Sequence, residues 1–208
     1  MSAHAKLTAA SAGPSSRAVL IEQVSKHFGS VQALRELSAE IHYGKLTGLV
    51  GPDGAGKTTL MRILTGLLVP NSGRATLAGF DVVEDNDAIH VASGYMPQRF
   101  GLYEDLSVME NMQLYAQLRG MDVKQHTDLF AELLEFTRLG PFTERLAGNL
   151  SGGMKQKLGL ACALMARPKV LLLDEPSVGV DPVSRQDLWR MVEALTDDGM
   201  AVVWSTAY

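Results

Sequence analysis

The chain has 208 residues, of which 46% are hydrophobic and 20% are charged. This composition is that of a folded globular protein and is too apolar for a disordered one. The formal net charge of −4 excludes an overall basic field that would attract nucleic acid or anionic lipid. The single cysteine, Cys162, excludes an internal disulfide bond and indicates a reducing compartment.

Residues 1–18 are rich in Ala and Ser and lack the apolar core of a secretory signal. We expect them to form a disordered tail. No apolar run in the sequence approaches the roughly 20 residues that span a bilayer. Any membrane role is therefore expected to depend on a partner.

The next part of the chain alternates β-like runs with turns. Two such runs between residues 19 and 43 flank a turn at Gly29-Ser30. Residues 46–50 (LTGLV) are typical of a strand buried on both faces, and an amphipathic helix is expected over residues 59–68 (TLMRILTGLL). Residues 74–82 and 91–98 then predict two further strands.

The middle of the chain is predicted to be helical from Ser107 to about Arg138, and S-x-x-E at residues 107–110 is a capping box. After it come a helix at 150–166, a strand at 169–176 (KVLLLDEP), a helix at 187–195 and a last strand from Ala201. Strands and helices thus alternate at both ends around a helical middle. The pattern predicts an α/β fold, a parallel-sheet core with an inserted α-helical subdomain.

Residues 51–58 (GPDGAGKT) match G-x-x-x-x-G-K-[ST] between an expected strand and an expected helix. In such a loop the backbone N–H groups form a nest for phosphate oxygens, and the helix N-terminus adds a partial positive charge. Lys57 would reach the β- and γ-phosphates of a nucleotide, and the Thr58 hydroxyl would bind Mg²⁺. We expect Asp53 to point outward, since a carboxylate is unfavourable beside phosphates. The alternative is an ordinary glycine turn with a solvated lysine. The candidate nucleotide-binding residues here are Gly51, Pro52, Asp53, Gly54, Ala55, Gly56, Lys57, Thr58 and Thr59.

Two adjacent acids end the strand at 169–176. Asp174 would hold Mg²⁺ directly or through water, and Glu175 stands where a general base could polarise the attacking water. Alone, the pair could equally be a strand end that meets solvent. A phosphate loop about 120 residues upstream favours the catalytic interpretation.

Residues 150–157 (LSGGMKQK) predict a helix capped by Ser151, with Gly152 and Gly153 leaving its first N–H groups open to an anion. The alternative is a capped helix without a ligand. With the phosphate loop and the two acids, this segment resembles the ATP-binding cassette (ABC) ATPases, whose signature is LSGG followed by a polar, basic helix. The resemblance covers residues 19–208. It implies a P-loop NTPase (RecA-like) core with an N-terminal antiparallel β subdomain, and a head-to-tail dimer in which Ser151, Gly152 and Gly153 contact the γ-phosphate bound to the opposite subunit.

The resemblance assigns three further residues. Gln98 in YMPQ matches the glutamine that touches Mg²⁺ and the attacking water, and Phe28 in KHFG matches the aromatic that stacks on adenine. Asp181 in SVGVDP matches the aspartate that communicates across the dimer. From the residues alone, Phe28 could instead be an edge-strand core aromatic, and Asp181 a helix N-cap before Pro182. The implied catalytic residues are Glu175, Gln98 and Lys57, the metal-binding residues are Thr58, Gln98 and Asp174, and the cofactors are ATP and Mg²⁺.

The segments 51–62, 94–112 and 150–164 are similar to ATPase subunits of ABC-2-type exporters, among them tandem proteins with two cassettes in one chain. This implies multidrug or small-molecule efflux, with partners in a second ATP-binding domain and in ABC-2-type permease subunits, and no nucleic-acid partner. The chain would be cytoplasmic and peripheral to the inner (plasma) membrane. The core would span 19–98 and about 159–208, and the helical subdomain about 99–158, where Met109, Met112, Leu114 and Tyr115 would offer an apolar groove.

The last strand leads into Ser205-Thr206-Ala207, where the family typically has S-T-H with a switch histidine. Ala207 has no donor for the γ-phosphate, so we expect weak ATPase activity. Because the family continues beyond this loop, we also expect the chain to be truncated at its C-terminus. One alternative is a degenerate ATP-binding half of an asymmetric tandem ATPase. Another is a soluble ABC-type ATPase acting on nucleic acid or ribosomes.

Overall fold

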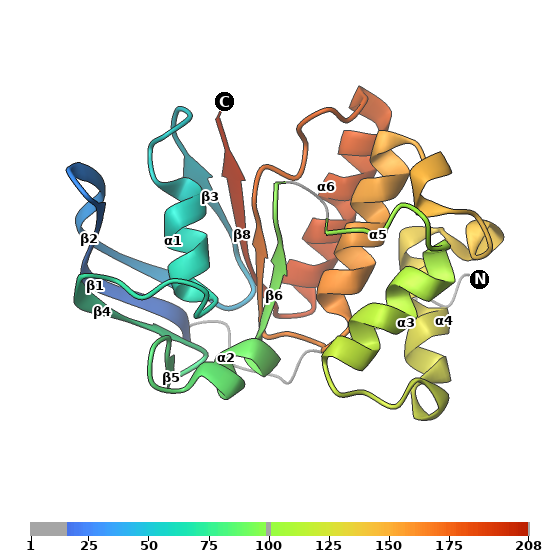
Figure 1. Cartoon of the computed structure of the whole chain (residues 1–208), viewed down its shortest axis with the longest axis horizontal. Helices are drawn as coiled ribbons and strands as arrows, with labels where there is room; N and C mark the ends of the chain where they lie inside the picture. Colours follow the sequence, from blue (N-terminus) through green and yellow to red (C-terminus); the bar gives the residue numbers. More distant parts are fainter. Residues whose placement is uncertain (1–15, 99–100, 208) are drawn as a thin grey trace.

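The computed structural model describes residues 16–98 and 101–207, and its strands form two sheets (Figure 1). One sheet is antiparallel, with strand order β2-β1-β4-β5, and the other is parallel, with order β3-β8-β7-β6. The antiparallel strands are β1 (Arg17–Phe28), β2 (Val31–His42), β4 (Ser72–Leu77) and β5 (Phe80–Asp81). The parallel strands are β3 (Leu46–Val50), β6 (Ser93–Met96), β7 (Val170–Leu173) and β8 (Ala201–Thr206).

Six α-helices lie within the described residues: α1 (Lys57–Leu64), α2 (Asn86–Ala92), α3 (Val108–Leu118), α4 (Thr127–Thr137), α5 (Gly152–Leu164) and α6 (Pro182–Asp197). Short 3₁₀ turns occupy Val123–Gln125, Gly140–Phe142 and Ala147–Asn149. Figure 1 shows α1 between the two sheets and α3 to α6 on the far side of the parallel sheet. None of the helices in the described ranges is long and apolar enough to cross a membrane.

The parallel sheet separates two hydrophobic clusters because successive side chains of a strand point to opposite faces. Leu171 and Val202 pack with helices α3 to α6, whereas Leu172 and Val203 pack with α1 and the antiparallel sheet. The predicted α/β fold, with a parallel core, an N-terminal antiparallel sheet and added helices, is therefore confirmed.

Strand β3 differs from its expectation of burial on both faces. It lies at the edge of the parallel sheet, and Val50 is 68% exposed. A short apolar run does not distinguish an edge strand from a central one, because the distinction depends on the strand order.

Other boundaries also differ from the predictions: the helix expected at 187–195 begins at Pro182, and the strand expected at 169–176 ends at Leu173. Helix α1 ends at Leu64, because Gly66 takes a left-handed conformation with φ of 72°, and Leu67 is exposed. Gly120, with φ of 70°, similarly interrupts the predicted helix of residues 107–138 between α3 and α4. Helix α2 was not predicted, and its last two residues, 91–92, were assigned to the following strand.

The predicted boundaries at the two ends of the chain also differ from the structure. Strand β1 begins at Arg17, two residues before the expected start, and residues 1–15 of the predicted tail lie outside the described residues. At the other end β8 continues through Thr206, where a turn was expected, and Tyr208 is not among the described residues.

The local signals for helix starts are confirmed. Ser107 Oγ accepts a hydrogen bond from the Glu110 N–H, and the Glu110 carboxylate accepts one from the Ser107 N–H, which forms the capping box. By contrast, the residues expected to offer an apolar groove on α3 belong in part to the core. Met112 is fully buried with Val108, and Met109 and Tyr115 pack against the same cluster.

Candidate functional site

The glycine-rich loop of residues 51–56 connects the C-terminal end of β3 to the N-terminus of α1. Its last residue, Gly56, has φ of 89°, and a Cβ there would lie 2.3 Å from the Ala33 carbonyl oxygen of β2. Only glycine satisfies both constraints. No side chain caps α1, so the loop stands over an open helix N-terminus, which is suited to phosphate. Asp53 is exposed in the turn of this loop, as expected.

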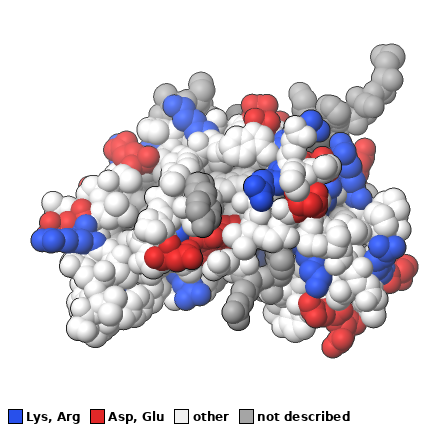
Figure 2. Space-filling view, turned by 90° about the horizontal axis from the view of Figure 1, so that it is seen from above, with Lys and Arg blue, Asp and Glu red and all other residues white. Residues whose placement is uncertain are grey.

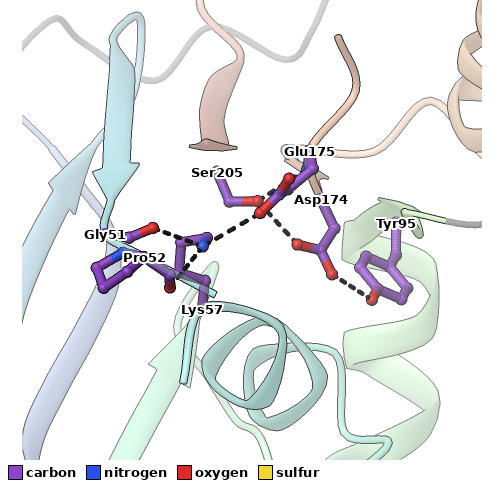
Figure 3. A network of polar contacts seen from close by, with 7 residues as sticks. All are labelled: Gly51, Pro52, Lys57, Tyr95, Asp174, Glu175 and Ser205. Atoms are coloured by element: carbon purple, nitrogen blue, oxygen red, sulfur yellow. Dashed lines mark hydrogen bonds and ion pairs between the residues drawn. The ribbon is translucent and has the colours of Figure 1, made fainter. Parts of the chain in front are cut away.

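Lys57 folds back on its own loop. Its Nζ donates hydrogen bonds to the carbonyl oxygens of Gly51 at 2.7 Å and Pro52 at 3.1 Å, and it lies 3.1 Å from Glu175 Oε1 (Figure 3). Lys57 and Glu175 are both buried. The structure thus brings the predicted phosphate-binding lysine and the predicted general base into one ion pair.

Asp174 and Glu175 follow β7 and are held by groups from both neighbouring strands. Ser205 Oγ on β8 donates to Asp174 Oδ1 at 2.8 Å and accepts a hydrogen bond from the Glu175 N–H at 2.8 Å. The Tyr95 hydroxyl on β6 donates to Asp174 Oδ2 at 3.3 Å (Figure 3). Burial, and next the charge of Asp174, raise the pKa of Tyr95 to about 12, so this hydroxyl stays a donor near neutral pH.

The backbone of Glu175 is unusual, with φ of 50°. A residue with a branched or long side chain seldom takes this left-handed conformation unless its surroundings impose it, and such residues cluster at functional sites. Here the Ser205 hydroxyl accepts the Glu175 N–H. The strained position therefore lies at the predicted general base.

The remaining residues predicted for this site lie near the same edge of the sheet or on the first turn of α1. The Asp174 N–H donates to the Met96 carbonyl oxygen at 2.9 Å, and Gln98 follows two residues after Met96, exposed. Thr58 and Thr59 are half-buried in the first turn of α1. Phe28 ends β1 and is 50% exposed, with Lys26 Nζ 5.3 Å from its ring centroid, so it is not a core aromatic.

The LSGG segment begins α5, and Ser151 Oγ accepts a hydrogen bond from the Met154 N–H at 3.3 Å, which confirms the predicted N-cap. Its glycines pack against the start of α6. A Cβ on Gly153 would lie 2.2 Å from Ser184 Oγ, and one on Gly152 would lie 3.0 Å from the Gly179 carbonyl oxygen. Asp181 caps α6, accepting from the Val183 and Ser184 N–H groups.

Ala207 follows β8 and lines a cavity of about 630 Å³ together with Glu175, Val178, Trp189 and Trp204. The cavity connects the end of β8 with the general base and with the segment that leads to α6. The space next to Ala207 is therefore open on the side of Glu175.

The site suits Mg²⁺ as a partner of nucleotide rather than as an ion held by protein alone. Within residues 16–98 and 101–207, no group of three or more His, Cys, Asp or Glu side chains could hold a metal. Magnesium ordinarily binds through one or two carboxylates, phosphates and water. The hydroxyl of Thr58 and the carboxylate of Asp174 provide such hard oxygen ligands.

Sequence reasoning assigned no role to Ser205 or Tyr95, although Ser205 opens the S-T-A segment and Tyr95 opens YMPQ. Their signal is the strand pairing: Leu173 pairs with Trp204 on β8 and with Met96 on β6. Ser205 therefore lies beside Asp174 at the end of the next strand. Only the strand order reveals this.

This fold and this site define a P-loop nucleotide-binding protein. The family described as ABC transporter matches residues 34–178, and the chain belongs to that family as an ATP-binding domain.

Figure 2 shows basic and acidic side chains interspersed over the face of the molecule seen from above.

Similar proteins are also ATP-binding proteins of ABC transporters or of drug resistance. The chain is 64% identical, over 176 residues, to the probable multidrug ABC transporter ATP-binding protein YbhF of Escherichia coli (strain K12), covering 85% of this chain and 30% of that protein. It is 36% identical over 191 residues to the daunorubicin resistance ATP-binding protein DrrA3 of Streptomyces coeruleorubidus. That match covers 92% of this chain and 60% of that protein. The chain thus spans about a third of the length of the first relative and three fifths of the second.

Solved structures show the same fold. A nucleotide-free ATP-binding cassette from an ABC transporter superposes with a TM-score of 0.83 at 26% identity, covering 93% of this chain and 82% of that one. The ADP conformation of another such cassette gives a TM-score of 0.81 at 26% identity, with the same coverage. Proteins of this family bind ATP and, in general, hydrolyse it.

Proposed function

We propose that this chain is the ATP-binding and ATP-hydrolysing part of an ABC-2-type export system for multidrug or small-molecule efflux. The observation that carries the proposal is the buried network that joins Lys57, Asp174 and Glu175 beneath the glycine-rich loop. The names of the relatives, which refer to multidrug transport and drug resistance, support the export substrate class.

In this proposal the residues of the network act on ATP as follows. Lys57 leaves the carbonyl oxygens of its loop and binds the β- and γ-phosphates. Thr58, Asp174 and Gln98 would hold Mg²⁺, which would supply positive charge to neutralise the phosphates. Glu175 accepts a proton from the water that attacks the γ-phosphate. Phe28, exposed at the end of β1, stacks on the adenine.

The second half of the site comes from another cassette. Ser151 caps α5, and Gly152 and Gly153 keep the first turn of that helix free of side chains. We propose that this helix N-terminus binds the γ-phosphate of the opposite subunit in a head-to-tail dimer. ATP would then hold the dimer closed, and its hydrolysis would loosen it.

A cavity of about 720 Å³ is the proposed contact site for the membrane subunits. It lies between α2, the end of α3 and the start of α4, and its apolar lining includes Val91, Leu118, Met121 and Leu129. Val91 and Leu118 are among the most exposed large apolar residues described. The helical subdomain, about residues 99–158, would transmit motion there. The chain would then be cytoplasmic and peripheral to the inner membrane.

The test is a pair of variants in the purified chain together with its partner cassette. Lys57→Ala is expected to weaken ATP binding at least tenfold, because the phosphate-binding ammonium is lost. Glu175→Gln is expected to bind ATP and to lose turnover. Undiminished hydrolysis in Glu175→Gln, or unchanged ATP affinity in Lys57→Ala, would contradict the proposal.

A second candidate is an ATP-binding half with little hydrolysis of its own. The observation that favours it is Ala207, which adjoins Glu175 along one cavity and has no donor for a phosphate. Measuring ATPase activity with and without a partner cassette separates the candidates. A degenerate half binds ATP in both conditions, and any turnover then requires the phosphate loop of the partner.

A further inference from the structure

Ser205 is a fully buried residue that touches both acids of the site. A hydroxyl has one proton to donate and can accept in turn. Ser205 uses its proton on Asp174 Oδ1 and accepts the Glu175 N–H, both at 2.8 Å. These two hydrogen bonds fix the orientation of the Ser205 hydroxyl. Because Ser205 is buried, bulk water does not compete for either bond.

We infer that Ser205 is a positioning residue that sets the geometry of Asp174 and Glu175 and so controls how strongly Mg²⁺ supports nucleotide binding. The inference rests on the proposed function, since it assumes that Asp174 serves Mg²⁺. It adds a residue from β8 that acts through the two carboxylate-bearing residues.

Asp174 is held on both of its oxygens. Ser205 donates to Oδ1 from β8, and Tyr95 donates to Oδ2 from β6, the two strands that flank β7. A carboxylate held by two donors cannot rotate freely, so its remaining lone pairs keep a fixed direction. Groups that hold a metal-binding carboxylate in this way commonly change metal affinity 10- to 100-fold when they are removed.

Glu175 depends on the same hydroxyl through its backbone. Its φ of 50° is costly for a residue with a side chain, and the Ser205 Oγ accepts its N–H in this conformation. Without that acceptor the buried N–H would be left unpaired, which favours a different backbone conformation. The carboxylate of Glu175 would then move from its place beside Lys57.

The experiment compares Ser205→Ala with a matched loss of a buried hydroxyl. Ser93→Ala is the control, because Ser93 is also buried in the parallel sheet. Ser93 begins β6, at the end of the sheet opposite to Ser205, and its hydroxyl donates to the Ile89 carbonyl oxygen. For each variant, the affinity of the chain for a non-hydrolysable ATP analogue is measured by calorimetry over a range of Mg²⁺ concentrations.

Ser205→Ala is expected to raise the Mg²⁺ concentration for half-maximal enhancement of binding about tenfold. The affinity without Mg²⁺ is expected not to fall, because the phosphate loop is unchanged and displacement of Glu175 from Lys57 would only free the ammonium for phosphate. Ser93→Ala is expected to change neither quantity. Equal Mg²⁺ dependence in Ser205→Ala and Ser93→Ala would overturn the inference while leaving the proposed function in place.

Tyr95→Phe provides a second measurement if Ser205→Ala does not fold. It keeps the ring and removes the hydroxyl, which donates to Asp174 Oδ2 and also interacts with Arg62, so the Mg²⁺ requirement is expected to rise in the same direction. An unchanged requirement in Tyr95→Phe would overturn the inference. A wild-type chain that does not bind the analogue at all would overturn both the inference and the proposed function.

Discussion

Lys57 Nζ lies 3.1 Å from Glu175 Oε1, with the two side chains only 6% and 9% exposed. The predicted phosphate-binding lysine and the predicted general base therefore neutralise each other in this structure. If the proposed function holds, nucleotide phosphate and Glu175 compete for the same ammonium.

The first prediction concerns this competition. Glu175→Gln leaves a buried ammonium without its counter-charge, which is destabilising. The variant is expected to bind a non-hydrolysable ATP analogue at least about fivefold more tightly than the wild type and to melt at a lower temperature without nucleotide. Calorimetry and thermal melts check both. Glu104→Gln, which removes a carboxylate paired with Lys155 at the surface, is the control, and equal behaviour of the two variants would refute the competition.

The second prediction concerns the contact between α5 and α6. Gly153→Ala places a methyl group 2.2 Å from Ser184 Oγ and 2.4 Å from Ser184 Cβ, so the two helix starts must separate. Overpacking of this kind typically costs about 1–3 kcal/mol. Adding Ser184→Gly is expected to restore part of the lost stability in a denaturant titration. If the double variant is no more stable than Gly153→Ala, the steric explanation is wrong.

The third prediction concerns Ala207. Ala207→His introduces a donor next to a cavity of about 630 Å³ that also contacts Glu175. A single donor aimed at transition-state charge is worth about 10²-fold or more in rate. The hydrolysis rate of a complete dimer is expected to rise at least about tenfold, as measured by phosphate release. Ala207→Leu adds volume without a donor and should not accelerate the reaction. An unchanged rate in Ala207→His would show that the missing histidine does not limit the activity.

The fourth prediction concerns pH. The hydrogen bond from Lys157 at 2.9 Å, and then the charges of nearby basic residues, hold the pKa of Asp187 below its usual value. Because the pKa is lower in the folded state, the ion pair between α5 and α6 stabilises the fold above the unfolded-state pKa of about 3.9. That stabilisation is lost as the pH falls through the folded-state pKa.

Asp187→Asn is accordingly expected to lower stability at pH 7 by up to about 1 kcal/mol, since the pair is partly exposed. This corresponds to roughly 2–4 °C in a protein of this size. The difference from the wild type should shrink steadily when melts are repeated down to pH 3. A difference that persists at pH 3 would assign the effect to packing and not to charge.

Motifs and caps made much of the fold predictable from sequence. The capping box at Ser107 and the N-caps Ser151 and Asp181 were identified because each depends on residues within one turn of a helix. The phosphate loop and the two acids after β7 were found for the same reason, since each motif is local in sequence.

What could not be predicted depends on strand order and on glycine conformations. The exposure of Val50 follows from the edge position of β3, and no property of residues 46–50 indicates it. The early ends of α1 and of the predicted 107–138 helix follow from the left-handed Gly66 and Gly120. Ser205 joined the site only because β8 lies next to β7.

The last two residues of β8 contact both the glycine-rich loop and the two predicted catalytic acids. The Thr206 carbonyl oxygen accepts a hydrogen bond from the Gly51 N–H, where the phosphate loop begins, at 3.2 Å. Ser205, one residue earlier, holds the two acids. A shift of this strand end would therefore act on the glycine-rich loop and on the two acids at once. The two parts of the predicted site are linked through one peptide unit of β8.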